Sequence, residues 1–72
     1  MKNNANLPLL KEEEKQMCRM LMEHHAVYKA ASELDFSPAK TKRIMKMLHR
    51  LSGMETFPDL LLFLRDHPEW YA

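Results

Sequence analysis

The chain contains a single glycine, Gly53, among its 72 residues. The whole sequence has only four prolines, so it contains few of the glycine and proline residues that the turns of a many-stranded sheet require. The length permits one small domain and leaves no room for a doubly wound nucleotide-binding fold, a barrel or a two-lobed active site. Hydrophobic residues make up 46% of the chain, which is too much for a disordered polypeptide. We therefore expect an all-α fold with a small core.

The number of cysteines and the length of the apolar runs favour a location in the cytoplasm. One cysteine excludes an internal disulfide framework and suits a reducing environment. The longest apolar run, Leu60–Leu64, is far shorter than the roughly 20 residues of a membrane-spanning helix or the roughly 7–15 apolar residues of a signal peptide. We expect a cytoplasmic protein with no membrane partner.

Local signals predict where the first two helices begin and end. The first begins at residues 11–12, because three consecutive glutamates meet the positive end of the helix dipole, and it ends at the His24-His25 pair. We expect these glutamates to be exposed. The second helix covers 27–34 and stops at Asp35, since aspartate tolerates the left-handed conformation better than most residues.

The third and fourth helices have stronger signals. Ser37-Pro38 provides a cap and a first residue for a helix over 38–51, and Gly53 suits a left-handed C-cap. Thr56–Asp59 begins a fourth helix, which ends before His67-Pro68 because proline disfavours helix at the preceding residue. The chain is thus divided into a flexible N-terminal tail (1–9), a four-helix domain (10–66) and an aromatic C-terminal tail (67–72).

Mostly apolar residues, with one histidine and one threonine among them, recur at helical spacing in the predicted helices, which places one side of each helix in the core. These residues are Met17, Met20, Leu21 and His24 in the first helix; Val27, Ala30, Ala31 and Leu34 in the second; Thr41, Ile44, Met45, Leu48 and Leu51 in the third; and Leu60, Leu61, Phe63 and Leu64 in the fourth.

The formal net charge is only +1, but the basic residues concentrate in the predicted third helix. Between Phe36 and Met54 there is no acidic residue, and the basic ones are Lys40, Lys42, Arg43, Lys46 and Arg50. A merely solvated helix face usually mixes charges of both signs and gains i,i+4 ion pairs. The acid-free helix therefore favours an electrostatic footprint for phosphate, with a solvated face as the alternative.

The second and third predicted helices also fit a helix-turn-helix over 27–51. Ala31 supplies the small residue inside the first helix of the motif, and Leu34 supplies an apolar residue three positions later. Asp35 stands at the turn position where glycine is usual, and Phe36 follows as an apolar plug. Thr41 and Ile44 occupy the inward positions of the second helix. Asp35 and Thr41 are the two polar departures.

The stretch 10–64 resembles the DNA-binding domain of the LuxR/GerE family, without a gap. The matching residues are Leu10, Glu14 and Met17–Leu21 in the first helix, Ala30-Ala31 and Leu34 in the second, Phe36-Ser37 at the turn, Gly53 after the third helix, and Asp59-Leu60-Leu61 in the fourth. The family's Thr-Val pair reads Lys40-Thr41 here, its mid-helix His reads Ile44, and its Lys-Leu before the glycine reads Leu51-Ser52. Region 4 of sigma factors is the close rival within this fold.

The resemblance implies a DNA-binding regulator of bacterial or phage-type transcription whose third helix enters the major groove of double-stranded DNA. The residues implied to contact DNA are Ser37, Lys40, Lys42, Arg43, Lys46 and Arg50, with Arg50 directed toward backbone or solvent. In the family the last helix often pairs two subunits. The implied homodimer or partner interface comprises Leu60, Leu61 and Leu64, for which plain core is an equal alternative, and Trp70 is a further candidate anchor.

A protein-interaction module is the second hypothesis. The family departures, the seven methionines and the aromatic end favour a domain that binds a transcription regulator or a polymerase subunit instead of DNA. Trp70 and Tyr71 then either anchor a partner or cover the base of the core. The oligomeric state, the DNA sequence and the sign of regulation are not indicated.

Other chemistry has little support in the sequence. His24 and His25 are adjacent and point in different directions, so we expect no metal site. Cys18 lies among apolar residues and is interpreted as a buried thiol. With no paired carboxylates and no glycine-rich phosphate loop, we expect neither an enzyme nor a cofactor.

Overall fold

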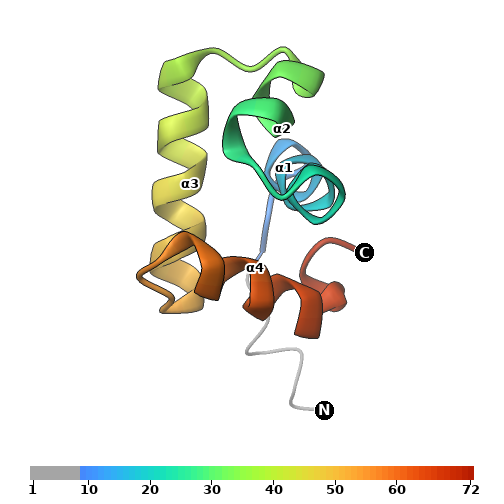
Figure 1. Ribbon diagram of the computed structural model, residues 1–72, viewed down its shortest axis with the longest axis vertical. Coiled ribbons are helices and arrows are strands. Elements are labelled where there is room, and N and C mark those ends of the chain that lie inside the picture. Colours follow the sequence, from blue (N-terminus) through green and yellow to red (C-terminus); the bar gives the residue numbers. More distant parts are fainter. Residues whose placement is uncertain (1–8) are drawn as a thin grey trace.

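The computed structural model describes residues 9–72, and these residues form four α-helices: α1 (Glu12–His24), α2 (Val27–Leu34), α3 (Pro38–Ser52) and α4 (Phe57–Asp66). A short 3-10 helix, η2 (Pro68–Trp70), follows (Figure 1). The predicted all-α, four-helix fold is confirmed, and α3 is one residue longer than predicted. The predicted N-terminal tail lies outside the described residues, apart from Leu9. No helix within 9–72 combines the length and the apolar character that crossing a membrane requires.

Left-handed residues end the first three helices. His25, Asp35 and Gly53 have φ angles of 58°, 59° and 76°, and each donates its backbone N–H to a carbonyl of the preceding turn. At the end of α3, the His49 ring Nδ1 also donates to the Met54 carbonyl oxygen over 2.7 Å. The stops predicted at Asp35 and Gly53 are therefore confirmed.

Side-chain caps begin α3 and α4. The Ser37 hydroxyl accepts from the Lys40 backbone N–H at 3.1 Å, and the Thr56 hydroxyl accepts from the Asp59 N–H at 3.2 Å. In α1 the capping contact comes from inside the helix, because Glu14 Oε1 accepts from the Lys11 backbone N–H at 2.8 Å. Glu14 is buried, which corrects the prediction that all three glutamates are exposed.

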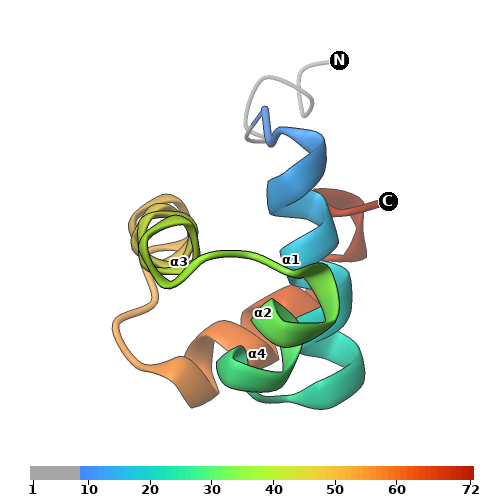
Figure 2. The same ribbon diagram turned by 90° about the horizontal axis from the view of Figure 1, so that it is seen from above.

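The core lies where all four helices meet. Fully buried side chains come from α1 (Met17, Cys18, Leu21), α2 (Ala30), α3 (Ile44, Leu48) and α4 (Leu60, Leu64). Figures 1 and 2 show α3 on one side of the molecule, beside the group formed by α1, α2 and α4. One side of α3 thus packs on the core and the opposite side faces outward.

Some predicted core residues are not in the core. Leu51 is 47% exposed, although Ile44, two turns earlier on nearly the same side of α3, is fully buried. Helical spacing predicts the direction of a side chain but not how far the neighbouring helices extend. Met20 and Met45 are only partly buried at the edge of the core.

In the predicted aromatic C-terminal tail (67–72), Trp70 and Tyr71 pack on the helices. The Trp70 ring is buried and meets Phe63 edge to face, with 4.8 Å between ring centroids. The Tyr71 hydroxyl donates to the Leu64 carbonyl at 3.2 Å, and Arg19 Nε donates to the Tyr71 carbonyl at 2.9 Å. Of the two roles considered for these aromatic residues, the structure shows that they cover the base of the core.

Candidate nucleic-acid interface

A tight turn sets the direction of α3 relative to α2. The Asp35 N–H donates to the Ser32 carbonyl at 3.2 Å, and the Phe36 N–H donates to the Ala31 carbonyl at 3.0 Å. Ala30 is the fully buried small residue of α2, whereas Ala31 is only partly buried. Ala31 borders an apolar groove between α2 and α3, together with Thr41 and Met45 of α3.

The inward side of α3 contains one buried polar residue, Thr41, and its hydroxyl group is hydrogen-bonded. Thr41 is buried beside Ile44, and its hydroxyl donates to the Ser37 carbonyl at 2.9 Å. A hydroxyl that is bonded within its own helix costs little to bury, because its hydrogen bond replaces the one that it makes to water. Thr41 is therefore compatible with the inward position that aliphatic residues usually fill.

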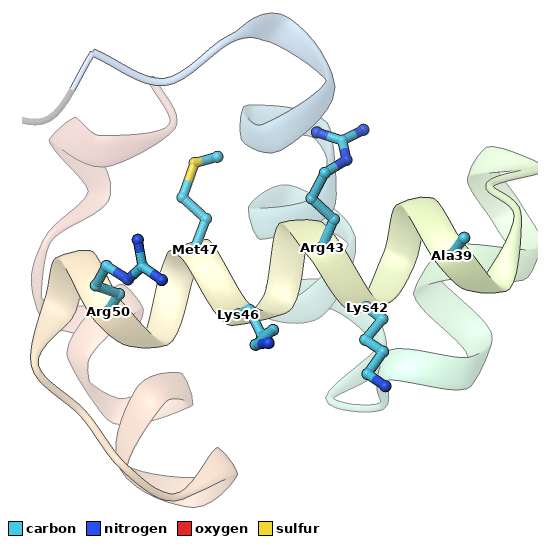
Figure 3. Close-up of a pocket in the computed structure, with 6 residues that line it drawn as sticks. All are labelled: Ala39, Lys42, Arg43, Lys46, Met47 and Arg50. Atoms are coloured by element: carbon cyan, nitrogen blue, oxygen red, sulfur yellow. The ribbon is translucent and has the colours of Figure 1, made fainter.

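The outward side of α3 carries exposed cations. We call Lys42, Arg43, Lys46 and Arg50 the basic face; with Ala39 and Met47 they border a shallow open hollow of about 460 Å³ (Figure 3). Lys42, Lys46 and Arg50 are spaced four residues apart, so they form a single row along the helix. Figure 3 shows Lys42 and Lys46 extending from one side of α3, and Arg43 and Met47 extending from another. The sequence of α3 contains no carboxylate that could neutralise this row.

Two cations of α3 have an acidic partner on another helix. Lys40 Nζ lies 3.0 Å from Glu13 Oε1, and Arg43 Nη2 lies 3.6 Å from Glu13 Oε2. The hydrogen bond from Lys40, followed by the charges of Lys40 and Arg43, lowers the pKa of Glu13 although partial desolvation opposes the shift. The ammonium of Lys40 also lies 4.9 Å from the centroid of the Phe36 ring.

The structure thus sorts the six residues predicted to contact DNA. Lys42, Lys46 and Arg50 form the outward row, and Arg43 lies beside it but contacts Glu13. Ser37 caps the helix, and Lys40 bends toward α1. Sequence reasoning missed Glu13, because the ion pairs join α1 to α3 and leave no periodic signal within either helix.

The residues predicted for an interface on α4 and at the C-terminal end lie mostly inside. Leu60 and Leu64 are fully buried and Trp70 nearly so, which agrees with the core alternative for these two leucines. Leu61 and Leu62 instead border a hollow of about 670 Å³ between α4 and the end of α1.

An apolar groove of about 720 Å³ opens beside the basic face. It is bounded by α2, α3 and the first turn of α4, with Lys42 at its edge. Its apolar lining consists of Val27, Tyr28, Ala31, Phe36, Pro38, Met45 and Phe57. The Tyr28 side chain is 85% exposed.

Buried and metal-ligating groups add no second site to the described part of the chain. Cys18 is fully buried, and this desolvation raises the pKa of its thiol to about 12. At neutral pH the thiol is protonated and shielded from solvent. Within 9–72, no three His, Cys, Asp or Glu side chains gather in a way that could hold a metal ion.

Comparisons of the chain with protein-family models, curated proteins and solved structures find no match.

Proposed function

We propose that the chain is a DNA-binding protein of the LuxR/GerE type, which places α3 in the major groove of duplex DNA to control transcription in a bacterial or phage system. The observation that carries this proposal is the outward, acid-free row of Lys42, Lys46 and Arg50 on a helix held by a tight turn. The residue-by-residue resemblance of 10–64 supports it. In this proposal the protein is a cytoplasmic binding protein and not an enzyme.

The geometry of α3 supports groove binding. A helix of 15 residues is about 22 Å long, and its basic row covers about 12 Å of that length. An α-helix fits the major groove of B-form DNA, where lysine and arginine can donate to guanine O6 and N7 or to the flanking phosphates. Lys42 and Lys46 lie near the middle of α3, so we assign base and phosphate contacts to them. Arg50 is assigned to the phosphate backbone.

Charge reversal on the basic face tests the proposal. We expect Lys46→Glu to weaken binding to a fluorescently labelled duplex by at least about tenfold, and the double variant Lys42→Glu, Lys46→Glu to abolish it, because each change replaces a phosphate contact with repulsion. Arg65→Glu makes the same change in net charge at an exposed position of α4 and is expected to bind nearly as the wild type does. Equal losses in Lys46→Glu and Arg65→Glu would show that α3 has no special role.

We further propose that the domain forms a homodimer through the outer side of α4. Leu61 and Leu62 would supply the apolar contact, since Leu60 and Leu64 are committed to the core. Sedimentation of the wild type and of Leu62→Glu tests this: the substitution is expected to shift the species from dimer to monomer without unfolding the domain. A wild-type monomer at all concentrations would overturn it.

The apolar groove favours a second candidate function. Its volume and its aromatic and methionine lining suit the apolar side of a helix from a transcription regulator or polymerase subunit. Exposed Tyr28 then makes a contact that the isolated domain does not need. If duplex DNA does not bind, cross-linking to such a subunit that is lost in Tyr28→Ala and kept in Lys46→Glu would favour this function.

A further inference from the structure

We propose that Glu13 competes with phosphate for two cations of α3 and thereby limits the affinity of this helix for DNA. This inference rests on the proposed function. It assigns to the same site a residue that lowers the affinity of α3 for DNA. Glu13 acts through Lys40 and Arg43 and need not touch the nucleic acid. It is a positioning residue supplied by α1.

The carboxylate of Glu13 divides its two oxygens between the two cations. Oε1 lies 3.0 Å from Lys40 Nζ and Oε2 lies 3.6 Å from Arg43 Nη2. Residues three apart on a helix are neighbours on its surface, so one carboxylate can bridge them. Both cations are drawn toward α1, away from the middle of the outward row.

The three side chains are exposed enough for phosphate to compete. The exposed fractions are 28% for Glu13, 37% for Lys40 and 52% for Arg43. Ion pairs at such positions are weak and exchange readily with solvent ions. A DNA phosphate that takes either cation must therefore displace the carboxylate or share the cation with it.

The remaining cations of α3 have no such competitor among residues 9–72. Lys42, Lys46 and Arg50 form no ion pair within that part of the chain. The structure thus separates α3 into three cations that are available at once and two that are available only after Glu13 releases them. α3 therefore makes fewer phosphate contacts than its five lysines and arginines would suggest.

The two neighbouring glutamates provide the comparison. Glu12 Oε2 pairs with Arg19 Nη1 of its own helix at 3.1 Å, and Glu14 accepts from the Lys11 backbone. Among these three consecutive carboxylates, only Glu13 is paired with α3. Glu12→Gln is therefore a matched control that makes the same change in net charge, one residue away, without altering the two ion pairs to α3.

The test measures the affinity of the full chain for a labelled duplex between about 50 and 200 mM salt. We expect Glu13→Gln to bind about 3- to 10-fold more tightly at low salt, and its slope of log K against log salt to be steeper by about 1 to 2, because each added phosphate contact contributes about 0.9. Glu12→Gln should gain little and keep the wild-type slope. In Glu13→Gln, adding Lys40→Gln and Arg43→Gln should remove the gain.

Each outcome decides the inference. If Glu13→Gln and Glu12→Gln are both folded by circular dichroism and have equal slopes of log K against log salt, the inference about Glu13 is wrong. In that case, salt-sensitive binding by the wild type still supports the proposed function. Absence of binding in the wild type and in Glu13→Gln overturns both. Binding by Glu13→Gln alone supports the inference in its strongest form, because the carboxylate then prevents binding altogether.

Discussion

Backbone conformation at single residues decides where the helices of this chain stop. Asp35 and Gly53 both adopt left-handed angles, and only glycine does so without a steric cost from its Cβ atom. A Cβ atom added at Gly53 would meet nothing within 4 Å, so any penalty there comes from the backbone alone. Replacing glycine at position 53 adds this steric cost, and introducing glycine at position 35 removes it.

We expect Gly53→Ala to lower the free energy of unfolding by about 1 kcal/mol and Asp35→Gly to raise it by about 0.5 kcal/mol. The gain at Asp35 is smaller because aspartate tolerates the left-handed conformation better than alanine does, so less strain is relieved. Urea denaturation followed by circular dichroism measures both. A stabilising Gly53→Ala would contradict the conformational account.

The buried thiol of Cys18 predicts a loss of stability at high pH. Its pKa is raised from 9.0 to about 12 in the folded protein, so between these values the unfolded chain loses a proton that the folded protein keeps. The free energy of unfolding should therefore fall as the pH rises above about 9, by up to about 1.4 kcal/mol per pH unit from this group. Urea titrations from pH 8 to pH 10 should show a shallower fall in Cys18→Ala; parallel curves would contradict this assignment.

At the scale of the elements, α3 depends on its cap as well as on its buried side. The Ser37 hydroxyl supplies one of the hydrogen bonds that the first turn lacks, and the Thr56 hydroxyl does the same for α4. We expect Ser37→Ala to cost about 1 kcal/mol of stability, measured by urea denaturation, and Ser37→Gly to cost less. Similar stability in Ser37→Ala and the wild type would show that the cap is not needed.

The helix boundaries were predictable from the sequence because their causes are local. Ser37-Pro38, Asp35 and Gly53 act on the turns in which they lie, and the observed helices begin and end within about a residue of the predicted positions. The burial of Glu14 was not predictable in this way, since it depends on what packs over the first turn of α1. Likewise, the contact of Glu13 with Lys40 joins residues far apart in the sequence.

At the scale of the whole molecule, the C-terminal aromatic residues complete a core that four short helices leave open at its base. Trp70 packs on Phe63, and Tyr71 is bonded to both α1 and α4. The sequence left the role of these residues open, because an aromatic end serves a core and a partner equally well. Only the arrangement of all the elements distinguishes the two roles.

We expect Trp70→Ala to lower the free energy of unfolding by about 3 kcal/mol, because it removes a large buried ring from the core. Tyr28→Ala, which truncates an aromatic side chain that is 85% exposed, should change it by less than about 0.5 kcal/mol. Thermal unfolding followed by far-ultraviolet circular dichroism compares the two. A small effect of Trp70→Ala would mean that residues 67–72 are dispensable for the fold.

The near-neutral charge of the whole molecule conceals the feature on which the proposed function depends. Acidic side chains elsewhere offset the basic face in the total but do not neutralise its outward row. The salt dependence of wild-type binding to duplex DNA tests this most directly. Three phosphate contacts from Lys42, Lys46 and Arg50 predict a slope of log K against log salt of about −3. Wild-type binding that does not change between about 50 and 200 mM salt would contradict the account, as would absence of binding at the lower concentration by both the wild type and Glu13→Gln.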